Sequence, residues 1–479
     1  MFTFAIMQNQ TSTSSKLSRY YAVIKSAIRG DEYDFTVIDL NKAIVLLAIP
    51  MMLELALESV FAVVDIFFVN KIGVHAVSIV GLTESVITIV YSVGIGLSAA
   101  ATAMVARRVG EKNYEEASHA GAQSILLSIV ASIVIGVPGF IFAGDILKLM
   151  GAQPEAIAKG IMYTRIMFGG NAVIILLFLI NGIFRGAGNA SIAMKSLWIG
   201  NIFNIILDPL LIFGIGFFPQ FGVTGAAIAT TTGRAVGVLY QVYHLYKSTG
   251  NLNLKLHHFK PDLKIIKSLT EIASPATFQF IIASASWIFL AAMVAEYGSA
   301  ASAGYQTAIR LIIFFILPAW GMSNAAATMV GQNLGAQLPL RAEKSVAITT
   351  KYNVVFMALV TCTFFFFARP LVSIFIPVEQ TEQLKYAVLS LQIISSGYIF
   401  YGIGMVTTQA FNGAGDTKTP TWIYFFGFWV FQIPFAYFLH TKTSLGATGV
   451  FIAIPIAETL MAIAVYILFR RGKWKMVKV

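Results

Sequence analysis

Three acidic residues within one apolar stretch are the first feature of this sequence that could do chemistry. Glu54, Glu58 and Asp65 lie in the stretch 42–69 and are separated by four and seven residues. On a helix they fall within about 40° of one another and form a single stripe. A carboxylate at bilayer depth costs on the order of 3 kcal/mol on insertion scales, so each should face a cavity or a partner rather than lipid. Alternatively, Glu54 and Glu58 lie near a membrane surface or neutralise a buried arginine such as Arg234.

A second polar group interrupts the apolar stretch 192–214. Asn204 and Asp208 are one helical turn apart. Pro209 follows and leaves the carbonyl of Ile205 without its usual helical partner, because proline has no backbone N–H. An acid, an amide and a freed carbonyl are hard oxygen ligands that suit a small hard cation, and the acid could instead carry a proton. The simpler interpretation is a proline kink with a satisfied polar cap.

Other ionisable residues carry weaker signals. Arg310 and Glu458 lie in apolar stretches of the second half and could pair with each other or line a cavity there. The six histidines show no zinc-ligand spacing within any apolar stretch. His257 and His258 are expected to be solvated in a polar linker. Neither a phosphate-binding GxxxxGK[ST] loop nor a set of catalytic residues in a polar segment is found, so we predict no ATP hydrolysis and no enzymatic activity.

The elements that must position these groups are long apolar helices. Apolar residues make up 57% of the 479 residues and charged residues 11%, and the mean hydropathy is +0.77, which indicates an integral membrane protein. Twelve runs are long enough to cross a hydrocarbon core of about 30 Å as helices. These runs are 42–69, 78–104, 121–143, 161–184, 192–214, 223–246, 267–295, 303–330, 346–369, 386–411, 420–440 and 447–469. They are continuous rather than alternating, so helices are favoured over barrel strands.

The sequence contains its first half twice. The recurring residues, each pair 225 positions apart, are Pro50 and Pro275, Gly96 and Gly321, and Gly110 and Gly335. Six spans per half give both halves the same orientation, related by a pseudo-two-fold axis along the membrane normal. We therefore expect a cytoplasmic extension (1–40), a first lobe (41–247), a linker (248–266), a second lobe (267–470) and a basic tail (471–479).

The net charge of +11 comes from basic residues whose positions indicate the membrane topology rather than a nucleic-acid partner. Most of the 33 Lys and Arg residues fall in alternate loops and at both ends of the chain. By the positive-inside rule both termini are cytoplasmic and the protein is a multi-pass component of the plasma membrane, which is the inner membrane in a Gram-negative cell. Arg185 is counted among these loop residues.

Several motifs together resemble the multidrug and toxic compound extrusion (MATE) transporters, over residues 40 to 470. The motifs are Pro50 followed by Asp65, Ala106-Arg107-Arg108-Val109-Gly110, Arg185-Gly186-Ala187-Gly188-Asn189, Asn204 to Pro209, Gly222 to Thr230, and Gly331-Gln332-Asn333-Leu334-Gly335. The resemblance implies an all-α fold in which two parallel six-helix repeats form a V-shaped central cavity. It also implies ion-driven export of amphipathic or cationic small molecules by alternating access, without a cofactor.

The resemblance carries over a cation or proton site in the first lobe. The matching positions are Asp65, Asn204, Asp208 and Thr230, of which the first three would be metal ligands if the coupling ion is Na⁺ rather than H⁺. Their counterparts in the second half are Leu290, Trp429, Ile433 and Ile454. A branch of the family with an acid in the seventh span has its counterpart at Ala283, which counts against such a site here. Glu54, Glu58, Arg310 and Glu458 remain candidates for lining a cavity or binding substrate.

Three other functions compete with this interpretation. A lipid-linked saccharide flippase of the same superfamily is the nearest, although those proteins tend toward a basic cavity, and here only Arg234 and Arg310 lie within spans. A membrane-embedded enzyme would need clustered His or acidic ligands near a membrane surface. A passive channel would show matching selectivity residues in both halves, whereas this repeat is chemically asymmetric.

Overall fold

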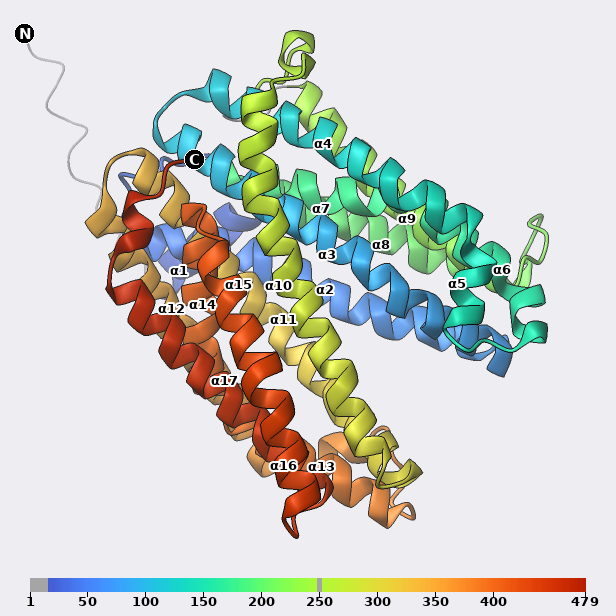
Figure 1. The fold of residues 1–479 in the computed structure, drawn as a ribbon. Coiled ribbons are helices and arrows are strands. Elements are labelled where there is room, and N and C mark those ends of the chain that lie inside the picture. The colour runs from blue at the N-terminus through green and yellow to red at the C-terminus, as the bar shows by residue number, and fades with distance from the viewer. Residues whose placement is uncertain (1–15, 248–251) are drawn as a thin grey trace, which may run out of the picture.

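The protein is all-helical, as the sequence predicts. The computed structural model describes residues 16–247 and 252–479, and within these ranges all regular structure is helical. Residues 1–15 of the predicted extension and 248–251 of the predicted linker lie outside the described residues. Two helical bundles diverge from the end of the molecule that carries α1 (Lys16–Arg29) and the C-terminus, which gives the expected V shape (Figure 1).

The first bundle contains the acidic stripe and the Asn204 to Pro209 motif. Its helices are α2 (Leu40–Asn70), α3 (Val74–Gly110), α4 (Tyr114–Ile141), α5 (Ala143–Leu149), α6 (Pro154–Gly169), α7 (Asn171–Gly186), α8 (Ala190–Phe213) and α9 (Val223–Tyr246). Side-chain caps fix where two of them begin: Asp39 accepts from the backbone N–H of Lys42, and Asn113 accepts from that of Glu116.

The second bundle repeats this order after a short 3₁₀ helix, η1 (Leu256–Phe259). Its helices are α10 (Leu263–Ala295), α11 (Ser299–Gly335), α12 (Pro339–Ser373), α13 (Thr381–Ser395), α14 (Tyr398–Ala414), α15 (Lys418–Tyr424), the π-helix η2 (Phe425–Gln432), α16 (Ile433–Lys442) and α17 (Ala447–Arg470). The chain ends after a 3₁₀ helix, η3 (Lys473–Met476).

Three predicted spans are not single regular helices. The stretch 161–184 is divided between α6 and α7 at Gly170, and 386–411 is divided between α13 and α14, which are bent by 54°. The stretch 420–440 contains the π-helix η2. Among the described residues, ten helices are long and apolar enough to cross a membrane, and the bent pair makes an eleventh. The one predicted span left over is 223–246, which forms α9 and is not among these helices. The count of twelve spans therefore stays a prediction.

The repeated glycines lie where the two bundles meet. A Cβ atom added at Gly96 in α3 would lie 2.1 Å from Oγ1 of Thr277 in α10. A Cβ atom added at Gly321 in α11 would lie 2.3 Å from the carbonyl oxygen of Met51 in α2. Only glycine permits helix backbones to approach this closely. The repeat therefore places the same small residue at two pseudo-symmetric crossings, α3 with α10 and α11 with α2.

Candidate functional site

Four polar side chains from three helices of the first bundle come together as one buried cluster. Asp65 belongs to α2, Asn204 and Asp208 to α8, and Thr230 to α9. All four are buried, and Asp208 is fully inaccessible to solvent. Nδ2 of Asn204 donates to Oγ1 of Thr230 at 3.1 Å, and Asp65 interacts electrostatically with Asp208. The structure thus brings together the four positions that the family resemblance selected.

The cluster has more acceptor oxygens than donors. Oδ1 of Asp65, Oδ1 of Asn204 and both carboxylate oxygens of Asp208 have no hydrogen-bond partner among the described residues. An unpaired buried carboxylate is costly, so such a group is stabilised by a cation or neutralised by a proton. Oxygens of two acids, an amide and a hydroxyl suit a small hard cation. The simpler interpretation of Asp208 as a satisfied polar cap does not hold, since neither of its oxygens is satisfied.

Glu58 differs from Asp208 in having a cationic partner, Arg234, which also interacts electrostatically with Asp65. Nη2 of Arg234, in α9, lies 3.4 Å from Oε1 of Glu58, and Nδ2 of Asn201 donates to the other carboxylate oxygen at 3.3 Å. The guanidinium also lies over the ring of Tyr91, 5.2 Å from its centroid. Glu58 therefore neutralises Arg234, which is the alternative that the sequence left open.

Glu54 also has a cationic partner, Arg185, which the sequence placed among the loop residues. Nδ2 of Asn181 donates to its Oε1 at 3.0 Å, and Nη1 of Arg185 lies 3.7 Å from the same oxygen. Arg185 lies in the last turn of α7 with a side chain that is 11% exposed, so it is part of the bundle rather than a solvated loop. Nη2 of Arg185 also donates to Oγ of Ser98 at 3.0 Å.

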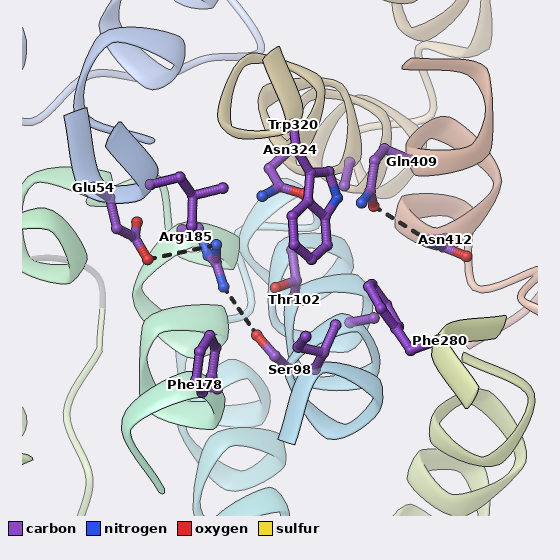
Figure 2. A pocket seen from close by; sticks show the side chains of 14 residues that line it. Glu54, Ser98, Thr102, Phe178, Arg185, Phe280, Trp320, Asn324, Gln409 and Asn412 are labelled. Atoms are coloured by element: carbon purple, nitrogen blue, oxygen red, sulfur yellow. Dashed lines mark hydrogen bonds and ion pairs between the residues drawn. The ribbon is translucent and has the colours of Figure 1, made fainter. Parts of the chain in front are cut away.

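A cavity between the bundles includes this Glu54–Arg185 pair. It encloses about 640 Å³ between atoms, part of it open to solvent. Trp320, Asn324, Gln409 and Asn412 of the second bundle line one side, opposite the Glu54–Arg185 pair, Ser98 and Phe178 of the first bundle (Figure 2). Amide groups, aromatic rings and one internally neutralised ion pair therefore surround the same space.

Glu84 is a further acid of the first bundle, and the sequence patterns assigned it no role. Glu84 lies on α3, and its carboxylate interacts electrostatically with Asp65, Arg234 and Arg310. Arg310 is exposed on α11 of the second bundle, so this interaction crosses between the bundles. Glu84 stands in an apolar stretch among Thr and Ser residues. An isolated acid within an apolar span is the sequence feature that could have marked it as a candidate site residue.

Glu458 and Arg310 do not form the pair that the sequence raised as a possibility. No ion pair joins them among the described residues, and Glu458 instead lines a cavity within the second bundle. That cavity lies between α10, α11, α13, α14 and α17. Glu458 therefore lines a cavity of the second half, which was the other interpretation of this residue from sequence.

The histidine pair is not simply solvated, which corrects the expectation from sequence. His258 is buried, and its Nε2 lies 2.9 Å from Oε1 of Glu115 at the start of α4, while Nε2 of His257 lies 3.0 Å from the same oxygen. Hydrogen bonds from His258, then His257, and then Lys255 lower the pKa of Glu115 to about 2. Nδ1 of His258 accepts from the backbone N–H of Lys255, so the proton is on Nε2, which leaves no lone pair there for a metal ion.

The chain folds into two bundles of repeated sequence that are joined at one end and diverge at the other, with a cavity between them. This arrangement defines a helical membrane transporter. The MatE family model matches the chain twice, over residues 50–210 and 275–438, which together make up more than half of it. The two matches begin at Pro50 and Pro275, the first pair of the repeat. The chain belongs to the MatE family.

Relatives and solved structures agree with this assignment along nearly the whole chain. The probable multidrug resistance protein YoeA of Bacillus subtilis is 25% identical over 88% of this chain and 91% of its own length. The FAD transporter of Shewanella oneidensis is 27% identical over 90% and 95%. A multidrug resistance MATE family transporter solved in an outward-facing conformation has a TM-score of 0.86 at 27% identity, covering 92% of this chain and 98% of its own. Two of these three are named as transporters and one as a probable multidrug resistance protein, and none of the three supports the flippase alternative.

Proposed function

We propose that this protein exports amphipathic or cationic small molecules in exchange for Na⁺ or H⁺, and that Asp65, Asn204, Asp208 and Thr230 bind the coupling ion. The observation that carries the proposal is the set of buried oxygens without partners on Asp65, Asn204 and Asp208. The repeat supports it, because the second bundle has the apolar residues Leu290, Ile433 and Ile454 at matching positions. Because the two bundles share one fold but only the first has acids at these positions, the repeat favours ion binding in the first bundle.

The conformation supports alternating access. The bundles interlock at the end that carries the C-terminus, where Nε2 of Gln332 donates to the carbonyl of Gly186 at 2.9 Å and Oγ1 of Thr328 donates to that of Arg185 at 3.0 Å. They diverge at the other end (Figure 1). If both termini are cytoplasmic, as the positive-inside rule predicts, this is an outward-facing state. Rocking of one repeat against the other would then expose the cavity to the cytoplasm.

Coupling would pass through α2. This helix carries Asp65 of the proposed ion site and Glu54 of the central cavity, and its Met51 backbone packs against Gly321 of the other bundle. An ion at Asp65 would therefore act on the same helix that contacts the substrate cavity and the opposite bundle. One charge moving down about 100 mV supplies about 2.3 kcal/mol, which holds a solute gradient on the order of fifty-fold.

The central cavity favours a small organic molecule as the exported species. Phe178, Phe280 and Trp320 provide aromatic surface, and Asn324 and Gln409 provide amide donors and acceptors. The Glu54–Arg185 pair leaves the cavity without a large excess of one charge. Few charges and several rings suit amphipathic substrates better than polyanionic ones. We infer that export proceeds without ATP and that nucleic acids are not partners.

Flux in proteoliposomes tests the proposal. Purified protein is reconstituted, and efflux of a cationic dye is measured under an imposed Na⁺ gradient and, separately, under a pH gradient. One gradient should drive the flux, and Asp65→Asn and Asp208→Asn should abolish it. Asp145→Asn, which changes an exposed acid of α5, is the matched control and should transport normally. Wild-type flux in both site variants, or flux that ignores both gradients, contradicts the proposal.

A further inference from the structure

Helix α1 carries an apolar stripe that the rest of the protein leaves uncovered. Tyr21, Ile24 and Ile28 are spaced by three and four residues, so their side chains lie along one line of the helix. Tyr21 is 70% exposed, and Ile24 and Ile28 are 38% and 37% exposed. On another side of the helix, Val23 and Ala27 pack into a hydrophobic core that α1 shares with α2. One side of α1 is therefore held by the protein while the apolar stripe faces outward.

The charges beside the apolar stripe are all positive. Lys25 and Arg29 are exposed and one helical turn apart, in the row next to the stripe. Neither forms an ion pair with another residue in the part of the chain that the structure describes. Over its 14 residues α1 contains four basic residues and no acidic residue. An apolar stripe flanked by lysine and arginine is typical of a helix that lies in a membrane interface, with its charges at the headgroups.

Two side chains of α8 hold the end of α1 at the level where α8 enters the membrane. Oγ of Ser191 donates to the carbonyl oxygen of Ile28 at 2.6 Å, and Nζ of Lys195 donates to that of Arg29 at 2.9 Å. Ser191 and Lys195 belong to the first two turns of α8, which is long and apolar enough to cross a membrane from Ala190 onward. The apolar stripe therefore lies beside a membrane surface rather than far out in solvent.

The segment that joins α1 to α2 keeps α1 in this place. It comprises residues 30–39 and contacts both bundles. Arg341 of α12, in the second bundle, donates to the carbonyl oxygen of Ile38, and Lys112, which follows α3 in the first bundle, forms an ion pair with Asp34. Helix α1 is thus bound to the folded protein at its side, at its end and through this segment. Its exposed face is part of the folded surface and not of a free tail.

The composition of this face favours lipid over protein as its partner. In a two-fold dimer the face would meet itself, and two helices that carry only positive charges would repel each other. An anionic membrane surface matches the charge, and it already lies at the level of the apolar stripe. The positive-inside rule places this end of the molecule in the cytoplasm, and the cytoplasmic leaflet is the one that contains anionic lipids.

We propose that α1 is an interfacial helix that docks on the anionic surface of the membrane. Its apolar stripe, formed by Tyr21, Ile24 and Ile28, enters the headgroup region. The side chains of Lys25 and Arg29 contact lipid phosphates. The proposal goes beyond the proposed function, because it assigns a partner to a surface that neither the ion cluster nor the central cavity uses. It holds whichever ion drives export.

The depth of a spin label at position 24 tests the proposal. The full-length chain carries Cys362→Ala, which removes its one cysteine, together with Ile24→Cys. One copy is placed in each nanodisc, made of phosphatidylglycerol or of phosphatidylcholine. Collisions of the label with O₂, which concentrates in lipid, and with a water-soluble nickel chelate report its depth. In phosphatidylglycerol the label should lie about 5 to 10 Å into the boundary between headgroups and acyl chains, and it should lie less deep in phosphatidylcholine.

Removal of charge provides the matched comparison. Lys25→Gln combined with Arg29→Gln changes two exposed side chains, so the protein should fold normally while the label moves out toward water in phosphatidylglycerol. Lys148→Gln combined with Lys159→Gln removes the same charge from exposed positions on α5 and α6 and should leave the depth unchanged. Both leaflets of a nanodisc have the same lipid, so the result does not depend on which way the chain is oriented.

The label also distinguishes lipid from other partners. A label on Ala22→Cys, which is exposed but outside the apolar stripe, should remain in contact with the nickel chelate in both lipids. Free access of the chelate to the label at position 24 in phosphatidylglycerol overturns the docking. Protection from both agents would mean that protein covers the stripe, and it also overturns the proposal. Equal depth in the two lipids, or unchanged depth after loss of Lys25 and Arg29, overturns the preference for an anionic surface.

Discussion

Gly110 of the first bundle lies directly against the backbone carbonyl of Gln332 in the second. A Cβ atom added at Gly110 would lie 1.9 Å from that oxygen. The relationship is reciprocal, because a Cβ atom added at Gly335 would lie 2.0 Å from the carbonyl oxygen of Arg107. The last turns of α3 and α11 therefore cross with no side chain between them, and the repeated glycines mark a direct backbone contact between the bundles.

We predict that Gly110→Ala and Gly335→Ala each open the end of the molecule where the bundles interlock. The added methyl group cannot be accommodated against backbone, so α3 and α11 must separate there. Double electron–electron resonance between spin labels on the two bundles should show a longer distance at that end. Dye flux in proteoliposomes should show slower transport. Gly81→Ala, also in α3, has no atom within 4 Å of the added methyl and should leave both unchanged. Equal effects of Gly81→Ala and Gly110→Ala would contradict this prediction.

Asp208→Asn should abolish transport without destabilising the protein. Both carboxylate oxygens are buried and unpartnered, so replacing the acid with an amide removes a desolvation cost and should stabilise the ion-free protein by about 1 to 3 kcal/mol. Thermal melting in detergent without Na⁺, together with dye flux, checks both parts. A lower melting temperature with flux lost in parallel would mean that Asp208 has a structural role instead.

The Glu58–Arg234 pair should show strong coupling in a double-mutant cycle. Arg234→Met alone leaves the half-buried Glu58 carboxylate without its partner and should cost about 3 to 5 kcal/mol. The double change Glu58→Gln with Arg234→Met should cost clearly less than the sum of the single changes, because neither charge is left alone. The free energy of unfolding in each variant is the measurement. Additive effects would mean that the two groups do not stabilise each other.

The contact between η1 and α4 should weaken in acid. The pKa of Glu115 is lowered to about 2, chiefly by His258 and His257. A lowered pKa stabilises the folded form above the unfolded value of about 4.5, and this contribution is lost as the pH falls from there toward 2. The melting-temperature difference between wild type and Glu115→Gln should therefore shrink as the pH falls below about 4.5. A difference that stays constant down to pH 3 would show that the carboxylate charge is not involved.

The architecture and the candidate ion site were accessible from sequence because both depend on local pattern. Long apolar runs require helices in a bilayer, and the repeat from Pro50 to Pro275 requires two equivalent bundles. The spacing of Asn204 and Asp208 places them on one helical face. The sequence placed Asp65 and Thr230 beside that face only through the resemblance to a family. The structure shows that α2, α8 and α9 converge there.

The partners of the charged groups were decided by tertiary structure. Arg185 reads as one more basic residue beside a loop, yet it lies against Glu54, 131 positions away in the sequence. Glu84 received no role because the groups it faces come from α2, α9 and α11, and no spacing rule joins those helices. An ion pair is a property of two side chains that meet in space, and sequence distance does not restrict it in a bundle of long helices.

The sequence by itself determined that this chain is a duplicated, all-helical membrane protein with its acids concentrated in one copy, because hydropathy, period and charge are properties of the linear order. The tertiary structure alone decided which acids are neutralised and which are not. Glu54 and Glu58 have arginine partners. Asp208 and Glu458 have none in the described part of the chain. That difference depends on three-dimensional packing, since a buried carboxylate takes its chemistry from whichever atoms the fold brings within a few ångströms of it.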